Sequence, residues 1–194
     1  MQDFLARMVD AYTIGRDATR VGLVNFAEQV DMYFTMDSFN DAASVKAAIK
    51  SMPYLGTADP TTNTPEALRV ARTQCFDPNR GARPDKTNVV IIVTDGLPTP
   101  SNREEEALNE AAMLANGHTI VVAVGITNAV TEDYIRGLSS RPKELNKQYF
   151  LLPNFNALTS IYSSLSVTTC PTEESKYVKF ICMFGWIFHS FMSK

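Results

Sequence analysis

The sequence lacks the residue groupings that mark a catalytic site or a nucleic-acid surface. Its two histidines, His118 and His189, suggest no pair, and no Ser-His-Asp grouping is apparent. No glycine-rich phosphate loop is visible. The formal net charge is −3 with both signs mixed, so no basic stripe is available to neutralise phosphates. We therefore expect neither an enzyme nor a nucleic-acid-binding protein.

Cysteines and long apolar runs are also scarce. The three cysteines lack the C-x-x-C spacing of a zinc site, and their odd number leaves at least one thiol unpaired within the chain. The first residues carry charges and no apolar run, so we expect no signal peptide there. The apolar segment at residues 177–192 is interrupted and is shorter than the roughly 20 residues of a membrane-spanning helix.

What the sequence does contain is enough apolar residues for one buried core. With 194 residues, 45% hydrophobic and 20% charged, we expect a single domain. We place that domain at residues 1–168 and treat residues 169–194 as a hydrophobic C-terminal tail of unknown role.

Hydrophobic periodicity and turn signals divide the chain into helices and strands. Asn40 or Asp41 is a predicted helix cap, Thr64 before Pro65 is another, and Ser101 with Glu104 has the pattern of a capping box. The predicted helices lie near residues 4–12, 42–52, 64–75, 101–116, 131–138 and 156–165, and the predicted strands lie at 21–26, 30–34, 88–94, 119–126 and 148–151.

The order of these elements indicates the fold class. The first two strands form a hairpin, and afterwards helices and strands alternate, which favours a mainly parallel sheet with helices on both faces. We therefore expect a doubly wound α/β fold with one antiparallel edge strand. Such sheets bind ligands beyond the carboxyl ends of their strands.

Two clusters of oxygen-bearing side chains lie where such a site is expected. Asp95 follows the buried strand 88–94 directly, and a turn before Gly96 is the plain structural alternative. Thr62 and Asn63 stand just before a predicted helix, where Thr64 serves as the cap. Hydroxyl and carboxylate oxygens are the ligands that hard divalent cations prefer.

These segments carry a family resemblance. Segment 62–68, Thr-Asn-Thr-Pro-Glu-Ala-Leu, and segment 90–96, Val-Ile-Ile-Val-Thr-Asp-Gly, resemble two parts of the metal-ion-dependent adhesion site of von Willebrand factor type A domains. Strands 20–26 and 123–126 are also similar to family strands. Segment 76–84, Phe-Asp-Pro-Asn-Arg-Gly-Ala-Arg-Pro, resembles the matrilin and collagen VI type of domain.

The resemblance implies a metal and ligand site at Thr62, Asn63, Asp95 and Gly96. In the family, Thr62 would coordinate the ion directly, Asp95 would act directly or through water, and an Asp-x-Ser-x-Ser motif after the first strand would supply the other ligands. That motif is absent from the chain. Because Mg²⁺ favours six oxygens, we expect Mg²⁺, Mn²⁺ or Ca²⁺ to bind weakly.

By the same resemblance the chain lacks the family's first strand, which would be central in the sheet, and looks truncated at its N-terminus. Exposed pairing groups on both neighbouring strands would unfold a domain of about 5–15 kcal/mol stability unless another segment fills the gap. Residues 178–188 are our candidate for that segment. The alternatives for the tail are a frayed helix, a membrane-associating stretch or translated non-coding sequence.

The implied function is that of a secreted, extracellular adhesion module that recognises collagen or another matrix protein with the help of a divalent cation. The missing motif suggests that this chain performs the task poorly. Two alternatives stay open at this stage: a small α/β enzyme or nucleotide-binding domain that uses the same strand-edge crevice, and a non-functional truncated isoform.

Overall fold

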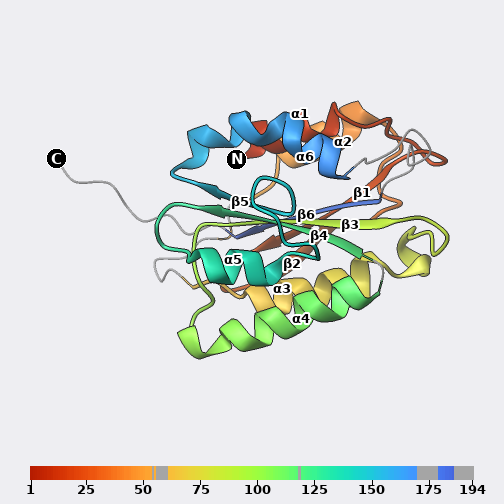
Figure 1. Cartoon of the computed structure of the whole chain (residues 1–194). Helices are drawn as coiled ribbons and strands as arrows, with labels where there is room; N and C mark the ends of the chain where they lie inside the picture. The colour runs from red at the N-terminus through yellow and green to blue at the C-terminus, as the bar shows by residue number, and fades with distance from the viewer. Residues whose placement is uncertain (54, 56–60, 118, 170–178, 186–194) are drawn as a thin grey trace.

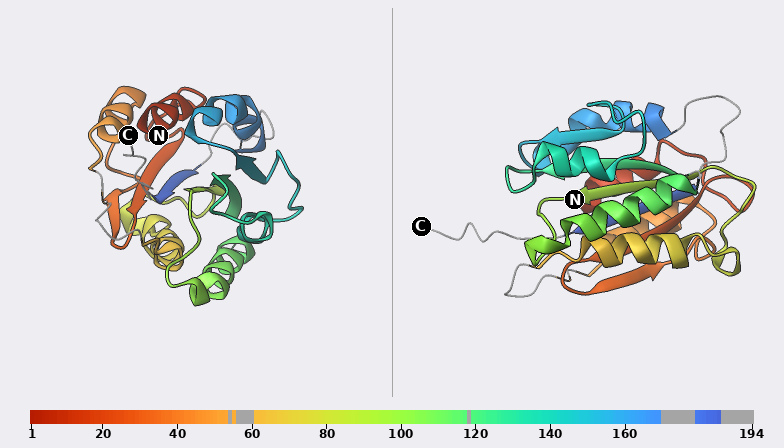
Figure 2. Two further views of the ribbon diagram at one scale, coloured as in Figure 1. Left: turned by 90° about the vertical axis from the view of Figure 1, so that its left-hand side faces the viewer. Right: turned by 60° about the horizontal axis from the view of Figure 1, so that its bottom comes forward.

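A computed structural model describes residues 1–53, 55, 61–117, 119–169 and 179–185. A six-stranded sheet in the order β2-β1-β6-β3-β4-β5 lies between two layers of helices (Figures 1 and 2). The strands are β1 (Arg20–Phe26), β2 (Val30–Phe34), β3 (Asn88–Thr94), β4 (Thr119–Ile126), β5 (Tyr149–Leu152) and β6 (Lys179–Gly185). β2 is antiparallel to β1 at one edge, and the other pairings are parallel. The predicted doubly wound α/β class is confirmed.

The helices cover both faces of the sheet. They are α1 (Gln2–Val9), α2 (Ala42–Lys50), α3 (Thr64–Val70), α4 (Glu104–Asn116), α5 (Glu132–Leu138) and α6 (Tyr162–Thr169). α1, α2 and α6 lie on one face, and α3, α4 and α5 lie on the other (Figure 1). In the described part of the chain, no helix combines the length and apolar character that crossing a membrane requires.

The β3 strand shows why the sheet has a core on each face. Successive side chains of a strand point to opposite faces. Val89, Ile91 and Val93 pack into the core beneath α1, α2 and α6, whereas Val90 and Ile92 pack against α3, α4 and α5. An unbroken apolar run is therefore what a strand covered on both faces requires.

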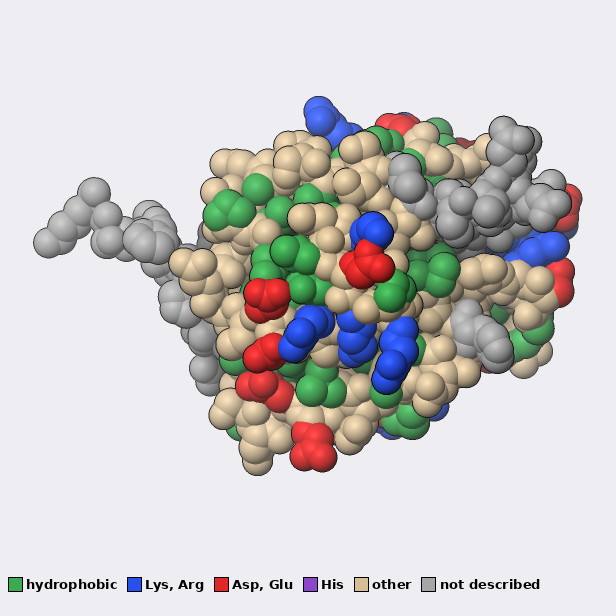
Figure 3. Space-filling view, in the orientation of Figure 1, with side chains coloured by type: hydrophobic (Ala, Val, Ile, Leu, Met, Phe, Trp, Pro, Cys, Tyr) green, Lys and Arg blue, Asp and Glu red, His purple; other side chains and the backbone are tan. Residues whose placement is uncertain are grey.

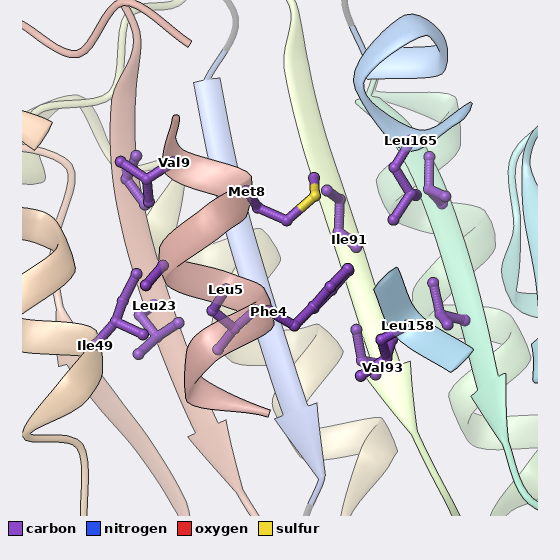
Figure 4. Packing of buried hydrophobic residues seen from close by; sticks show 14 of the residues in the cluster. Phe4, Leu5, Met8, Val9, Leu23, Ile49, Ile91, Val93, Leu158 and Leu165 are labelled. Atoms are coloured by element: carbon purple, nitrogen blue, oxygen red, sulfur yellow. The ribbon is translucent and has the colours of Figure 1, made fainter. Parts of the chain in front are cut away.

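The helix α1 anchors the first of these cores. Phe4, Leu5 and Met8 are almost fully buried and lie over the sheet, with Met8 beside Ile91 and Leu5 toward Leu23 (Figure 4). Their spacing gives one apolar face, as the 3.6-residue period of a helix demands.

The central position of the sheet is occupied by β6. It pairs in parallel with β1 on one side, from Arg20 with Lys179 to Phe26 with Gly185, and with β3 on the other. The hypothesis that the tail fills the vacant position is confirmed for residues 179–185; residues 178 and 186–188 lie outside the described residues. The domain boundary at residue 168 stays a prediction.

Several local predictions were wrong in detail. Of the two predicted caps of α2, Asp41 is the one in place, and its side chain accepts a hydrogen bond from the Ser44 amide. The capping box does not form, because Ser101–Arg103 is a 3-10 turn and α4 begins at Glu104 without a side-chain cap. Residues Phe155–Ile161 are likewise 3-10 rather than α-helical, and α3 continues as a π-helix over Ala71–Cys75.

The cap of α3 also differs from the prediction. Asn63, not Thr64, occupies the capping position, and its side chain makes no capping hydrogen bond. Thr64 is the first helical residue, and its hydroxyl is buried inside the protein. Pro65 fits the first turn because that turn leaves backbone amides without helical partners in any case.

Candidate functional site

Three loops meet beyond the carboxyl ends of the parallel strands. The Asn63 amide donates to the carbonyl of Ala27, which follows β1, at 2.8 Å. The Thr99 amide, in the loop after β3, donates to the Thr62 carbonyl at 3.1 Å. The predicted site segments, far apart in sequence, are therefore joined through their backbones at the edge where doubly wound sheets bind ligands.

Thr62 is completely buried, and its hydroxyl has no hydrogen-bond partner among the described residues. The same holds for the hydroxyl oxygens of Thr61 and Thr64. A buried polar group without a partner costs about 1–3 kcal/mol. Within the described parts of the chain, the Thr62 hydroxyl is thus a fixed oxygen without a partner, which is the state expected of a ligand-binding group.

Asp95 lies directly after β3 and is only 6% exposed. Its carbonyl accepts a 3.4 Å hydrogen bond from the Thr127 hydroxyl, which follows β4. The Thr94 hydroxyl donates to the carbonyl of Gly96 at 2.9 Å, so the turn that holds Asp95 is braced from within. The sequence-predicted residues Asp95 and Gly96 thus share the carboxyl edge with Thr62.

Asn63 serves the architecture of this edge. Its side-chain amide donates to the Glu28 carbonyl at 3.4 Å, and its side-chain oxygen accepts from the guanidinium of Arg103 at 2.8 Å. With both ends engaged inside the protein, the Asn63 side chain holds the segment of Thr62 against the turn after β1. We assign it a positioning role.

Arg103 connects this arrangement to α4. Its guanidinium also binds both carboxylate oxygens of Glu106, at 2.8 and 3.2 Å. The hydrogen bond from Glu106 raises the pKa of Arg103, and the reciprocal bond lowers the pKa of Glu106. The pair is partly solvent-exposed, so it contributes little to the free energy of folding. Its main effect is to fix the position of the Arg103 side chain.

Tyr134 of α5 lies on the inner side of the same edge. Burial raises the pKa of its phenol, the nearby Thr64 hydroxyl lowers it, and Glu104 raises it. The phenol oxygen and the Thr64 hydroxyl are both buried and do not reach hydrogen-bonding geometry with each other or with any other described group.

The donor set is small for a divalent cation. Among the described residues, no group of three or more His, Cys, Asp or Glu side chains is arranged so that it could hold a metal ion. The residues that follow Gly185, at the end of the central strand, include neither Asp nor Glu. Thr62 and Asp95 therefore fit part of a magnesium-type oxygen shell, and water or a ligand would have to supply the remainder.

Two residues of this edge were missed by sequence reasoning. Thr127 has a left-handed backbone with φ of 72°, which is unusual for a non-glycine residue, and its place just after β4 was the available signal. The sequence did not predict a role for Arg103, because only the folded chain brings Arg103 to Asn63. The three-residue spacing from Arg103 to Glu106 is a sequence signal for the ion pair between them, and it does not predict the bond to Asn63.

The sequence is similar to those of matrilins. The chain is 33% identical over 171 residues to mouse Matrilin-4, covering 88% of this chain and 26% of that protein. It is 29% identical over 185 residues to chicken Matrilin-1, covering 95% of this chain and 35% of the relative. The chain thus spans about a quarter to a third of the length of these relatives.

Solved structures show the same fold. Proximal thread matrix protein 1 from the mussel byssus, in a structure described as having a zinc-occupied MIDAS motif, has a TM-score of 0.74 at 22% identity, covering 86% of this chain and 39% of that one. Manganese-loaded TRAP from Plasmodium vivax has a TM-score of 0.64 at 19% identity, covering 82% and 62%. The family model of the von Willebrand factor type A domain matches residues 1–164. The chain therefore belongs to the von Willebrand factor type A family, and its sequence is similar to those of the matrilins.

Proposed function

We propose that the chain is a non-enzymatic, extracellular binding module that contacts a matrix protein, such as collagen, through the loops around Thr62 and Asp95. The observation that carries the proposal is the buried Thr62 hydroxyl, which is fixed by its backbone bonds and has no partner among the described residues. Family membership and the matrilin relatives support a secreted parent protein with a matrix partner.

A divalent cation would be held by Thr62 and Asp95, with Mg²⁺, Mn²⁺ or Ca²⁺ as candidates. The ion would attract a carboxylate of the partner protein as a further ligand. Since these two side chains offer few of the six oxygens that Mg²⁺ favours, binding by this chain should be weak. The zinc and manganese of the two solved relatives favour a divalent cation without indicating which one.

The backbone hydrogen bonds around Thr62 also support the proposal. A weak site gains affinity when its ligands are held in place before binding, because less conformational freedom is lost. Hydrogen bonds on both sides of Thr62 supply that order: its own carbonyl accepts from Thr99, and its neighbour Asn63 is tied to Ala27.

The test measures cation and matrix-protein binding by the whole chain. We expect Mn²⁺ to bind only in the millimolar range in calorimetry, and collagen binding in a solid-phase assay to fall when the cation is chelated. Thr62→Ala and Asp95→Asn should abolish both signals, whereas Thr62→Ser, which keeps the hydroxyl, should retain them.

Asp17→Asn is a matched control, since it removes one exposed carboxylate at the opposite edge of the sheet. Saturable binding at micromolar cation would overturn the expected weakness. Matrix binding that survives both chelation and Asp95→Asn would overturn the role given to this edge.

A further inference from the structure

A second polar site lies at the amino edge of the sheet, at the opposite end of the strands from Thr62. Here the chain forms a pocket of about 280 Å³, lined by Arg16, Arg20, Asp37, Asn40, Pro78, Asn79 and Gly81. Small-molecule pockets range from roughly 300 to 1,000 Å³, so this one has room for a single sugar-sized group.

Arg20 is the fixed cation of this pocket. Its guanidinium donates to the carbonyl of Arg16 and to the carbonyl of Gly81, both at 2.8 Å. Both acceptors are neutral, and within the described residues Arg20 forms no ion pair. The side chain is therefore oriented by neutral acceptors and can still form an ion pair with a bound anion.

Arg16 supplies a second cation at the rim. It is exposed and makes no side-chain hydrogen bond or ion pair with any residue that the structure describes. Asn40 and Asn79, which are both exposed, also line the pocket, and side-chain amides both donate and accept hydrogen bonds. Cations and amides together suit a ligand that carries an anionic group and hydroxyls.

One wall is the turn within segment 76–84, whose sequence suggested the matrilin type. Asp77 accepts hydrogen bonds from the Asn79 amide and side chain at 2.9 and 3.1 Å, which shapes a short 3-10 turn. Gly81 ends it with φ of 86°, and a side chain there would come within 2.7 Å of Asp37. The wall is thus fixed by close packing that only glycine permits.

We propose that this pocket binds one sulfated sugar unit of a matrix polysaccharide, with Arg16 and Arg20 on the sulfate and the side chains of Asp37, Asn40 and Asn79 on the hydroxyls. Guanidinium groups match the oxygens of sulfate as they match phosphate and carboxylate. This proposal stands apart from the cation edge and does not require it.

Asp37 decides the class of ligand. This exposed residue lines the pocket, and its carboxylate accepts a hydrogen bond of 2.5 Å from the Thr35 hydroxyl. A carboxylate repels a second anionic group and accepts from sugar hydroxyls, so a ligand with one sulfate among several hydroxyls fits better than an acidic peptide with repeated carboxylates.

The test titrates the whole chain with a sulfated disaccharide, its desulfated form and a short glutamate-rich peptide, following amide and arginine side-chain signals by nuclear magnetic resonance. Arg16→Ala should weaken binding of the sulfated disaccharide about tenfold, as loss of one charge-assisted hydrogen bond predicts. Arg16→Lys should recover part of that loss, and the desulfated form should bind at least tenfold more weakly.

Arg141→Ala is the control, because Arg141 is also exposed and unpaired in the described structure but lies in the loop between α5 and β5. Equal losses from Arg16→Ala and Arg141→Ala would reduce the effect to net charge and overturn the site. Binding that is indifferent to sulfate, or tighter to the peptide, would overturn the ligand class.

Discussion

Arg103 donates a 2.8 Å hydrogen bond to the side-chain oxygen of Asn63, which lies 40 residues earlier in the chain. That bond joins the loop after β3 to the segment that carries Thr62. The metal and ligand edge is therefore a set of loops held in register by a few polar contacts.

Replacing Arg103 tests this connection. Arg103→Ala should speed hydrogen exchange of the Asn63 amide several-fold and weaken Mn²⁺ binding, while global stability falls by less than about 1 kcal/mol because the Glu106 pair is exposed. Arg69→Ala is the control, since Arg69 pairs with Glu66 on the helix surface and makes no bond to Asn63. Unchanged exchange at Asn63 would contradict the positioning role.

The buried hydroxyl of Thr62 should lower the free energy of unfolding when no cation is bound. Thr62→Val keeps the shape of the side chain and removes a buried hydroxyl without a partner among the described residues. We expect the free energy of unfolding to rise by about 1 kcal/mol in urea denaturation without cation. Added Mn²⁺ should stabilise only the parent chain. If the valine variant is less stable, the hydroxyl has a partner within the protein.

The strand β6 should be necessary for folding. A chain that ends at residue 178 leaves β1 and β3 without a neighbour on facing sides, which exposes on the order of ten backbone groups. We expect it to lose the far-ultraviolet circular dichroism of the fold and become protease-sensitive. A chain that ends at residue 185 keeps β6 and should fold. A folded protein from the shorter chain would show that the strand is dispensable.

Cys75 should contribute to the pH dependence of stability. Its thiol is fully buried beside Met32, and burial raises its pKa far above the ordinary 9.0. The folded state therefore keeps a proton that the unfolded state releases, so stability falls as the pH rises above about 9.

The comparison is urea denaturation of the parent chain and Cys75→Ala between pH 8 and 10. The parent should lose up to about 1.4 kcal/mol per pH unit more than the variant once the unfolded thiol has ionised. Tyr134 also has a raised pKa, but its ordinary value of 10.0 places its effect higher. Parallel pH curves would refute the assignment to Cys75.

The sequence by itself determined the elements and the layers. Burial of β3 on both faces of the sheet follows from its run of five apolar residues, 89–93, which is typical of a strand covered on both sides. The loop positions of Thr62 and Asp95 followed equally from their places before a helix and after a buried strand, and local chemistry limited the cap of α2 to Asn40 or Asp41.

Tertiary structure decided what local patterns do not contain. Whether residues 179–185 enter the sheet depends on unpaired backbone on two strands far away in sequence, and no local preference records that. The role of Asn63 likewise depends on Glu28 and Arg103, which reach it only after folding. Periodicity and capping are short-range, so they specify segments. Strand order and shared polar contacts are long-range, so only the packed chain fixes them.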